Sequence, residues 1–191
     1  IVPEPADLRL AEILARNGWD TAAIVSHQFF RDADGALPAY ARGFETFDRA
    51  TMDAFYAKVQ ELDVPVFIHP VEVLGTDRLK SYYLSNLLGN PTETALAAAS
   101  LIFGGVLKEF PRLKFYLSHG GGSCPYLLGR WDHGWKVRTE GKVAIEREPS
   151  EYFKLLYFDA LVHSPSVLGH LVQSAGAERV MLGTDYPFDM G

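Results

Sequence analysis

The sequence has little cysteine, no long apolar run and no excess of positive charge, and each shortage excludes a class of protein. Cys124 is the only cysteine in 191 residues, so the chain has neither a disulfide framework nor a cysteine-based zinc cluster, and we expect a reducing, cytoplasmic location. The formal net charge of −6 argues against nucleic acid or an acidic membrane as a partner. No apolar run approaches the roughly 18 residues that span a bilayer, which leaves small molecules and other proteins.

Two sequence signals are also missing. Residues 1–5 lack the basic start and apolar block of a signal peptide, and the chain does not begin with methionine. We therefore expect a trimmed or partial copy of a longer protein. The run Gly120-Gly121-Gly122 lacks the GxGxxG spacing of a dinucleotide-binding loop, which favours a barrel over a doubly wound sheet.

Strand and helix patterns alternate along the chain. Residues 64–69 are apolar without alternation, which is typical of a strand buried on both faces of a parallel sheet. Asn90 is a favourable helix N-cap, followed by proline and by Glu93, which can complete a capping box. Short apolar runs predict five strands, at 21–26, 64–69, 113–119, 155–162 and 180–185. Helical spacing and start or stop residues predict helices at 6–16, 49–62, 90–111, 123–138 and 164–176.

Polar side chains fall where these strands end, and their placement favours a barrel. His69, His119, His163 and Asp185 each follow a predicted strand, and a (β/α)₈ barrel gathers such residues at one mouth. A doubly wound sheet is the alternative. We predict an α/β fold of the TIM-barrel type, with residues 1–191 as one domain that supplies about five of the eight βα units.

Three of these side chains are candidates for chemistry. The imidazoles of His69 and His119 can bind zinc or transfer protons near neutral pH. Asp185 would place a carboxylate in largely apolar surroundings, where a divalent cation is its natural partner; otherwise it is a turn residue. For His133 and His170, which lie inside predicted helices, a structural role is expected.

Five segments together resemble the amidohydrolase-related family, closest to its group of 2-amino-3-carboxymuconate-6-semialdehyde and resorcylate decarboxylases. The resemblance covers roughly residues 45–191. The segments are FIHP at 67–70, LSHGGGS at 117–123, LGR at 128–130, FDALV at 158–162 and VMLGTDYPF at 180–188.

The resemblance implies a role for each matching residue. His69 and Asp185 would bind a divalent metal, zinc or alternatively manganese, and Asp185 would also transfer a proton. His119 would polarise the substrate or activate a water. Arg130 would bind the substrate carboxylate, in some members at the neighbouring subunit's site; otherwise it is a surface residue of its helix. A homodimer or higher homo-oligomer is therefore expected.

One departure from the family pattern is the absence of a His-x-His pair, which the family carries on its first strand. His69 and Asp185 alone supply two ligands, whereas catalytic zinc usually has three protein ligands. The expectation is that the N-terminal strands of the barrel are missing from this sequence.

These observations lead to one hypothesis about function and two alternatives. The first is a metal-dependent decarboxylase that acts on a small carboxylated aromatic or muconate-like acid, with His119 and Asp185 as catalytic residues. The second is a metal-dependent hydrolase of an amide, lactone or ester, because fold and ligands alone do not separate the two reactions. The third is a catalytically incomplete barrel fragment that acts as an interaction module.

Overall fold

Five parallel strands form a single sheet in the computed structural model, which describes residues 23–25, 49–71 and 73–191. The predicted helix at 6–16 lies outside these residues. The strands are β1 (Ala23–Val25), β2 (Pro65–Ile68), β3 (Lys114–Leu117), β4 (Tyr157–Asp159) and β5 (Val180–Met181). All neighbouring pairs are parallel.

The strand order identifies the sheet as an arc of a barrel. It runs β1-β2-β3-β4-β5, so neighbours in sequence are neighbours in space. A doubly wound sheet would reverse its order at a switch point, and the described sheet has no such reversal. Sequential parallel strands joined by helices are the pattern of the (β/α)₈ barrel, and the prediction of a TIM-barrel-like fold is confirmed.

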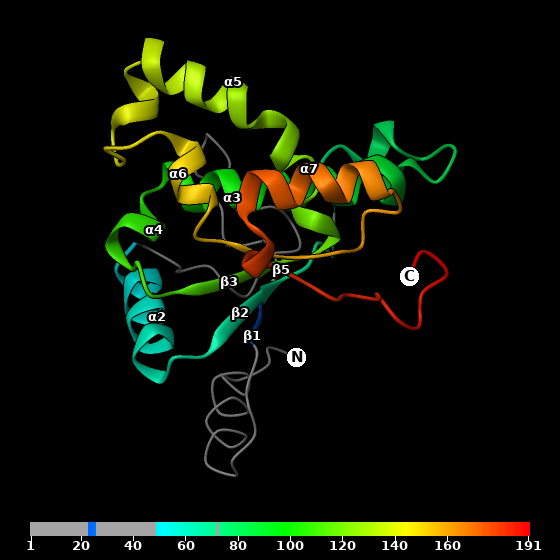
Figure 1. Cartoon of the computed structure of the whole chain (residues 1–191), viewed down its shortest axis with the longest axis horizontal. Coiled ribbons are helices and arrows are strands. Elements are labelled where there is room, and N and C mark those ends of the chain that lie inside the picture. Colours follow the sequence, from blue (N-terminus) through cyan, green and yellow to red (C-terminus); the bar gives the residue numbers. More distant parts are fainter. Residues whose placement is uncertain (1–22, 26–48, 72) are drawn as a thin grey trace.

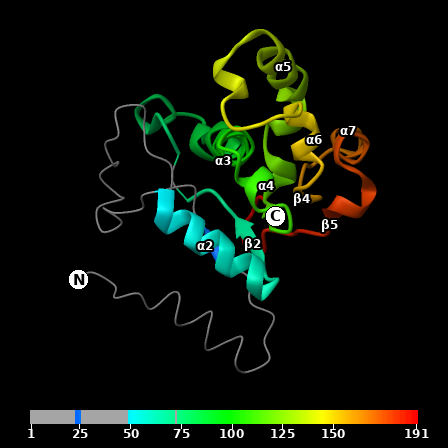
Figure 2. The same ribbon diagram turned by 90° about the vertical axis from the view of Figure 1, so that its left-hand side faces the viewer.

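Helices connect the strands and lie along the outside of the arc. Figures 1 and 2 place α3, α6 and α7 on the same side of the sheet, with α5 beyond α6 as an outer helix. The α-helices are α2 (Arg49–Leu62), α3 (Asn90–Phe103), α4 (Val106–Glu109), α5 (Cys124–Val137), α6 (Pro149–Phe153) and α7 (Pro165–Ala175). Among the described residues, no helix has the length and apolar character required to cross a bilayer.

The core lies between the sheet and these helices. Alternate strand residues point into it and are buried, among them Val66, Ile68, Phe115 and Leu117. Phe67 and Tyr116 point to the other face, where their ring centroids lie 5.1 Å apart and both residues are only partly buried. The prediction that 64–69 is buried on both faces was therefore wrong for the described chain. The interior of a complete barrel is filled by side chains from all eight strands, and the described part of the chain supplies five.

The start of α3 also differs from its prediction. A π-helical turn, Ser85–Gly89, runs directly into α3, so Gly89 and not Asn90 occupies the N-cap position. The Glu93 carboxylate accepts a hydrogen bond from the backbone N–H of Leu74 instead of completing a capping box. The local sequence predicted a helix start at Asn90. In the structure the preceding loop folds back onto α3, and the backbone N–H of Leu74 in that loop binds the Glu93 carboxylate.

Candidate metal centre

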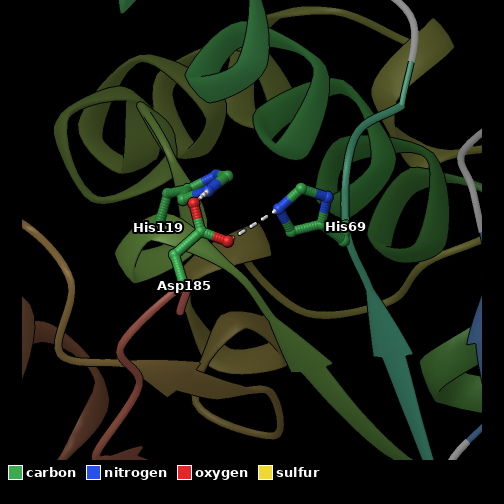
Figure 3. Close-up of side chains that lie close together, drawn as sticks. All are labelled: His69, His119 and Asp185. Carbon is green, nitrogen blue, oxygen red and sulfur yellow. Dashed lines mark ion pairs between the residues drawn. The ribbon is translucent and has the colours of Figure 1, made fainter. Parts of the chain in front are cut away.

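Three side chains that are far apart in the sequence meet at the carboxyl ends of the strands. His69 directly follows β2, His119 comes shortly after β3, and Asp185 lies beyond β5. One nitrogen from each histidine and one oxygen of Asp185 lie within 4.8 Å of one another. Figure 3 shows the Asp185 carboxylate facing both imidazole rings.

His69 contributes a buried ring nitrogen that lacks a hydrogen bond within the described chain. Its Nε2 atom lies 3.5 Å from Oδ1 of Asp185, yet it forms no hydrogen bond with any described residue. A buried polar atom without a partner is costly. The histidine and the carboxylate are therefore close enough to share a cation, which would satisfy both.

His119 is oriented by its neighbour in the sequence. Its Nδ1 atom lies 3.3 Å from the hydroxyl of Ser118, which leaves Nε2 facing Oδ2 of Asp185 at 3.9 Å. Burial, and after it the nearby His69, lowers the pKa of His119 below its usual value. The neutral form of the ring is therefore favoured, and in the tautomer whose Nδ1–H donates to Ser118 the Nε2 atom can accept a metal ion or a proton.

The three donors together suit a divalent cation. Imidazole and carboxylate are ligands that zinc and manganese both accept, and three protein ligands are the usual number at a catalytic zinc site. His119 thus brings a possible third ligand to the pair expected from sequence. The unpartnered Nε2 of His69 is the observation that a bound metal would explain.

The backbone at this mouth is unusual, because residues that carry the polar groups have left-handed conformations. The φ angles are +54° at His119, +53° at His163 and +49° at Asp185. Such angles cost a non-glycine residue free energy and are concentrated at functional sites.

Glycines make the turn after β3 possible. A Cβ on Gly120 would lie 2.3 Å from Cγ1 of Val162, and a Cβ on Gly122 would lie 2.0 Å from the carbonyl oxygen of Pro91. Both positions also have positive φ. The glycine run therefore allows His119 to turn back over the sheet while the chain passes close to α3 and to the segment after β4.

Asp159, at the end of β4, is a residue of this centre that sequence reasoning missed. It is 5 % exposed, and its carboxylate accepts hydrogen bonds from the backbone N–H groups of His119 at 2.9 Å and Gly120 at 2.7 Å. It forms part of the FDALV segment. A charged residue within an apolar strand requires hydrogen-bond or ionic partners, and this is the sequence signal that could have identified Asp159.

A pocket of about 280 Å³ opens beside the candidate metal ligands. Its polar lining comes from amides, imidazoles and one carboxylate, and none of its lining residues within the described chain is lysine or arginine. The polar lining residues are Asn86, Asn90, His119, His163 and Asp185. The apolar ones are Leu87, Pro91, Leu161, Val162, Val167 and Met190.

The other predicted residues lie elsewhere. Arg130 is exposed on α5 and does not line this pocket. His133 is also exposed on α5. The ring of His170 on α7 packs against Tyr126, with centroids 5.0 Å apart. The structural role expected for His170 agrees with that packing.

Comparison with known proteins identifies the family. The family model described as amidohydrolase matches residues 3–191. The chain belongs to the amidohydrolase family. The family predicted from the motifs is thereby confirmed.

Known relatives of this amidohydrolase include decarboxylases. The 2-amino-3-carboxymuconate-6-semialdehyde decarboxylase of Dictyostelium discoideum is 40% identical over 148 residues, 77% of this chain and 41% of its own length. The enzyme of the same name from Caenorhabditis elegans is 39% identical over 159 residues, 81% of this chain and 39% of its own length. The chain thus spans about two fifths of the length of these relatives.

A solved structure shares the fold. It is a dihydroxybenzoic acid decarboxylase from Polaromonas sp. JS666 with bound manganese and the inhibitor 2-nitroresorcinol. The TM-score is 0.75 at 28% identity, and the match covers 95% of this chain and 55% of that one. The likeness extends over nearly the whole chain, which supports reading its sheet as part of the same barrel.

Proposed function

We propose that this amidohydrolase is a metal-dependent carboxy-lyase that removes CO₂ from a small carboxylated aromatic or muconate-like acid. The observation that supports it most directly is the convergence of His69, His119 and Asp185 beside a small pocket. The named activities of the relatives point to decarboxylation and not hydrolysis.

In this proposal His69 and Asp185 hold the cation and His119 handles the proton. A bound divalent cation supplies positive charge that stabilises negative charge on substrate oxygens. Zinc is our first expectation, and manganese, which the Polaromonas structure holds, is the alternative. The distance of 3.9 Å between His119 Nε2 and Asp185 Oδ2 is short enough for a small shift to pass a proton between them.

Decarboxylation requires a proton at carbon, and these residues can deliver one. The substrate carbon that bears the carboxylate gains a proton, the bond to CO₂ breaks, and its electron pair stays with the carbon. His119 and Asp185 exchange that proton with each other and with solvent at the pocket mouth. Positioned proton transfer of this kind contributes on the order of 10²–10⁴ in rate.

The pocket lining restricts the substrate to a small molecule with one apolar side. Apolar residues such as Val162 and Met190 can contact a planar carbon skeleton, while Asn86 and Asn90 offer neutral hydrogen-bonding groups to its oxygens. Arg130 does not line this pocket. We propose that it acts across a homo-oligomer, binding the carboxylate of a substrate in the neighbouring subunit.

The proposal places the protein in the cytoplasm. Its only cysteine, Cys124, is a free and buried thiol, and burial raises the pKa of that thiol. A reduced, unreactive cysteine suits a reducing compartment.

Metal content and product analysis on the purified chain test the proposal. Near-stoichiometric zinc or manganese is expected, lost in His69→Ala and kept in His133→Ala, which alters an exposed histidine outside the centre. The loaded chain should release CO₂ from 2,6-dihydroxybenzoate or 2-amino-3-carboxymuconate-6-semialdehyde, and His119→Asn should keep the metal but lose CO₂ release. A loaded chain that releases none would refute decarboxylation; hydrolysis of an ester or lactone would then identify the hydrolase alternative.

A further inference from the structure

The buried carboxylate of Asp159 connects two strands of the site at once. Its Oδ2 accepts a hydrogen bond from the backbone N–H of His119, and its Oδ1 accepts from Gly120 and, at 3.1 Å, from Leu161. The bond to Leu161 closes a local turn after β4. The other two bonds cross to the segment after β3, where they hold the backbone of His119 and of Gly120.

The left-handed turn at His119 creates a need for this acceptor. His119 and Gly120 both have positive φ, +54° and +59°. Successive N–H groups in such a turn face one concave side and bind an anion there. The Asp159 carboxylate lies in that concavity, so its charge stabilises the strained conformation from which the His119 ring extends.

The segment leading to Asp185 packs against the same side chain. A Cβ on Gly183 would lie 2.5 Å from Cβ of Asp159 and 3.1 Å from its Oδ2. Glycine at 183 therefore lets the chain after β5 pass directly over Asp159, two residues before the Asp185 carboxylate. Asp159 thus lies between the backbone of His119 and the backbone that leads to Asp185.

We infer that Asp159 is a positioning residue that sets the distance between His119 and Asp185. The inference rests on the proposed function for its consequence at the metal, although the contacts stand by themselves. Groups that orient metal ligands from behind typically change metal affinity or activity 10- to 100-fold when they are replaced. Asp159 does so through backbone groups of the ligand-bearing segments and not through an imidazole nitrogen.

Asp159→Asn is the informative variant, because it keeps the size of the side chain and presents an NH₂ group to one of the N–H donors. Asp132→Asn is its matched control, since Oδ1 of Asp132 also accepts a backbone hydrogen bond, from Ser150 at 2.9 Å, but between α5 and α6. We expect Asp159→Asn to raise the dissociation constant for Mn²⁺ about 10- to 100-fold and to speed amide exchange at His119 and Gly120. Asp132→Asn should change neither.

The two readouts separate the possible outcomes. A folded Asp159→Asn variant with wild-type Mn²⁺ affinity, or with unchanged exchange at His119 and Gly120, overturns the inference. If the wild-type chain itself binds no Mn²⁺, the proposed function fails while amide exchange still decides the role of Asp159. If Asp159→Asn does not fold, Gly183→Ala replaces it: its methyl group displaces Asp159 without removing the carboxylate, and wild-type Mn²⁺ affinity there would overturn the inference.

Discussion

Replacing Gly122 with alanine perturbs the turn that places His119 over the sheet. Gly122 has φ +61° and ψ −128°, close to a region that is essentially restricted to glycine. The new Cβ would lie 2.0 Å from the carbonyl oxygen of Pro91, which also accepts a hydrogen bond from the backbone N–H of Ser123. Because the obstacle is backbone in α3, it cannot be relieved by rotation of a side chain.

Two contributions set the expected magnitude. A non-glycine residue in such a conformation costs about 1–3 kcal/mol, and forcing an extra methyl group into packed surroundings costs about 1–3 kcal/mol more. Alanine lowers the conformational entropy of the unfolded chain, which offsets this destabilisation by about 0.5–1 kcal/mol. We therefore expect Gly122→Ala to reduce the free energy of unfolding by roughly 1–5.5 kcal/mol.

Urea denaturation followed by circular dichroism measures this change, with Gly129→Ala as its control. Gly129 is exposed within α5, and a Cβ there would meet nothing within 4 Å. Alanine favours a helix interior over glycine by about 0.5–1 kcal/mol, so the control should be stabilised. Equal effects of the two substitutions, or a change below about 1 kcal/mol at Gly122, would refute the described turn.

Two further predictions concern pH. Burial, and then the charge of Asp53, raises the pKa of Tyr56 to about 12, so the folded chain should lose about 2–3 kcal/mol of stability between pH 10 and 12. Urea titrations should show this loss in wild type but not in Tyr56→Phe. The same pH dependence of stability in both proteins would contradict the prediction. The lowered pKa of His119 means that the unfolded chain binds its proton more readily, so stability is lost as pH falls below about 6.5. That loss, measured without metal, should shrink in His119→Asn, whose asparagine tolerates positive φ, and an unchanged acid limb would contradict it.

The elements themselves could largely be predicted from local pattern. The helix predicted at 49–62 coincides with α2, and β2 and β3 lie inside the runs predicted at 64–69 and 113–119. The helix has apolar residues at helical spacing, and the strands are continuous apolar runs. Packing in the core stabilises the same structures that these local patterns predict. The placement of histidines just beyond β2 and β3 followed directly, since parallel strands share one carboxyl edge.

What sequence could not predict depends on contacts between distant segments. The apolar run at 180–185 predicted a longer strand, but only Val180–Met181 pairs with β4, because Gly183 lies against Asp159 and Asp185 turns to positive φ. The role of Asp159 was hidden for the same reason, because the N–H groups of His119 and Gly120 that it accepts from lie in the segment after β3. No local pattern identifies the acceptor that a turn forty residues away requires.

The origin of the candidate ligands on three separate strands has a consequence for folding. His69, His119 and Asp185 come together only after β2, β3, β4 and β5 have paired in register. A cation held by His69 and Asp185 beside His119 then has no comparable site in the unfolded chain, so by mass action its binding favours the folded state alone. A free metal concentration one hundred times the dissociation constant would add about 2.7 kcal/mol to stability. If the chain binds metal as proposed, the metal supply of the cell would thereby determine the fraction of the protein that is folded.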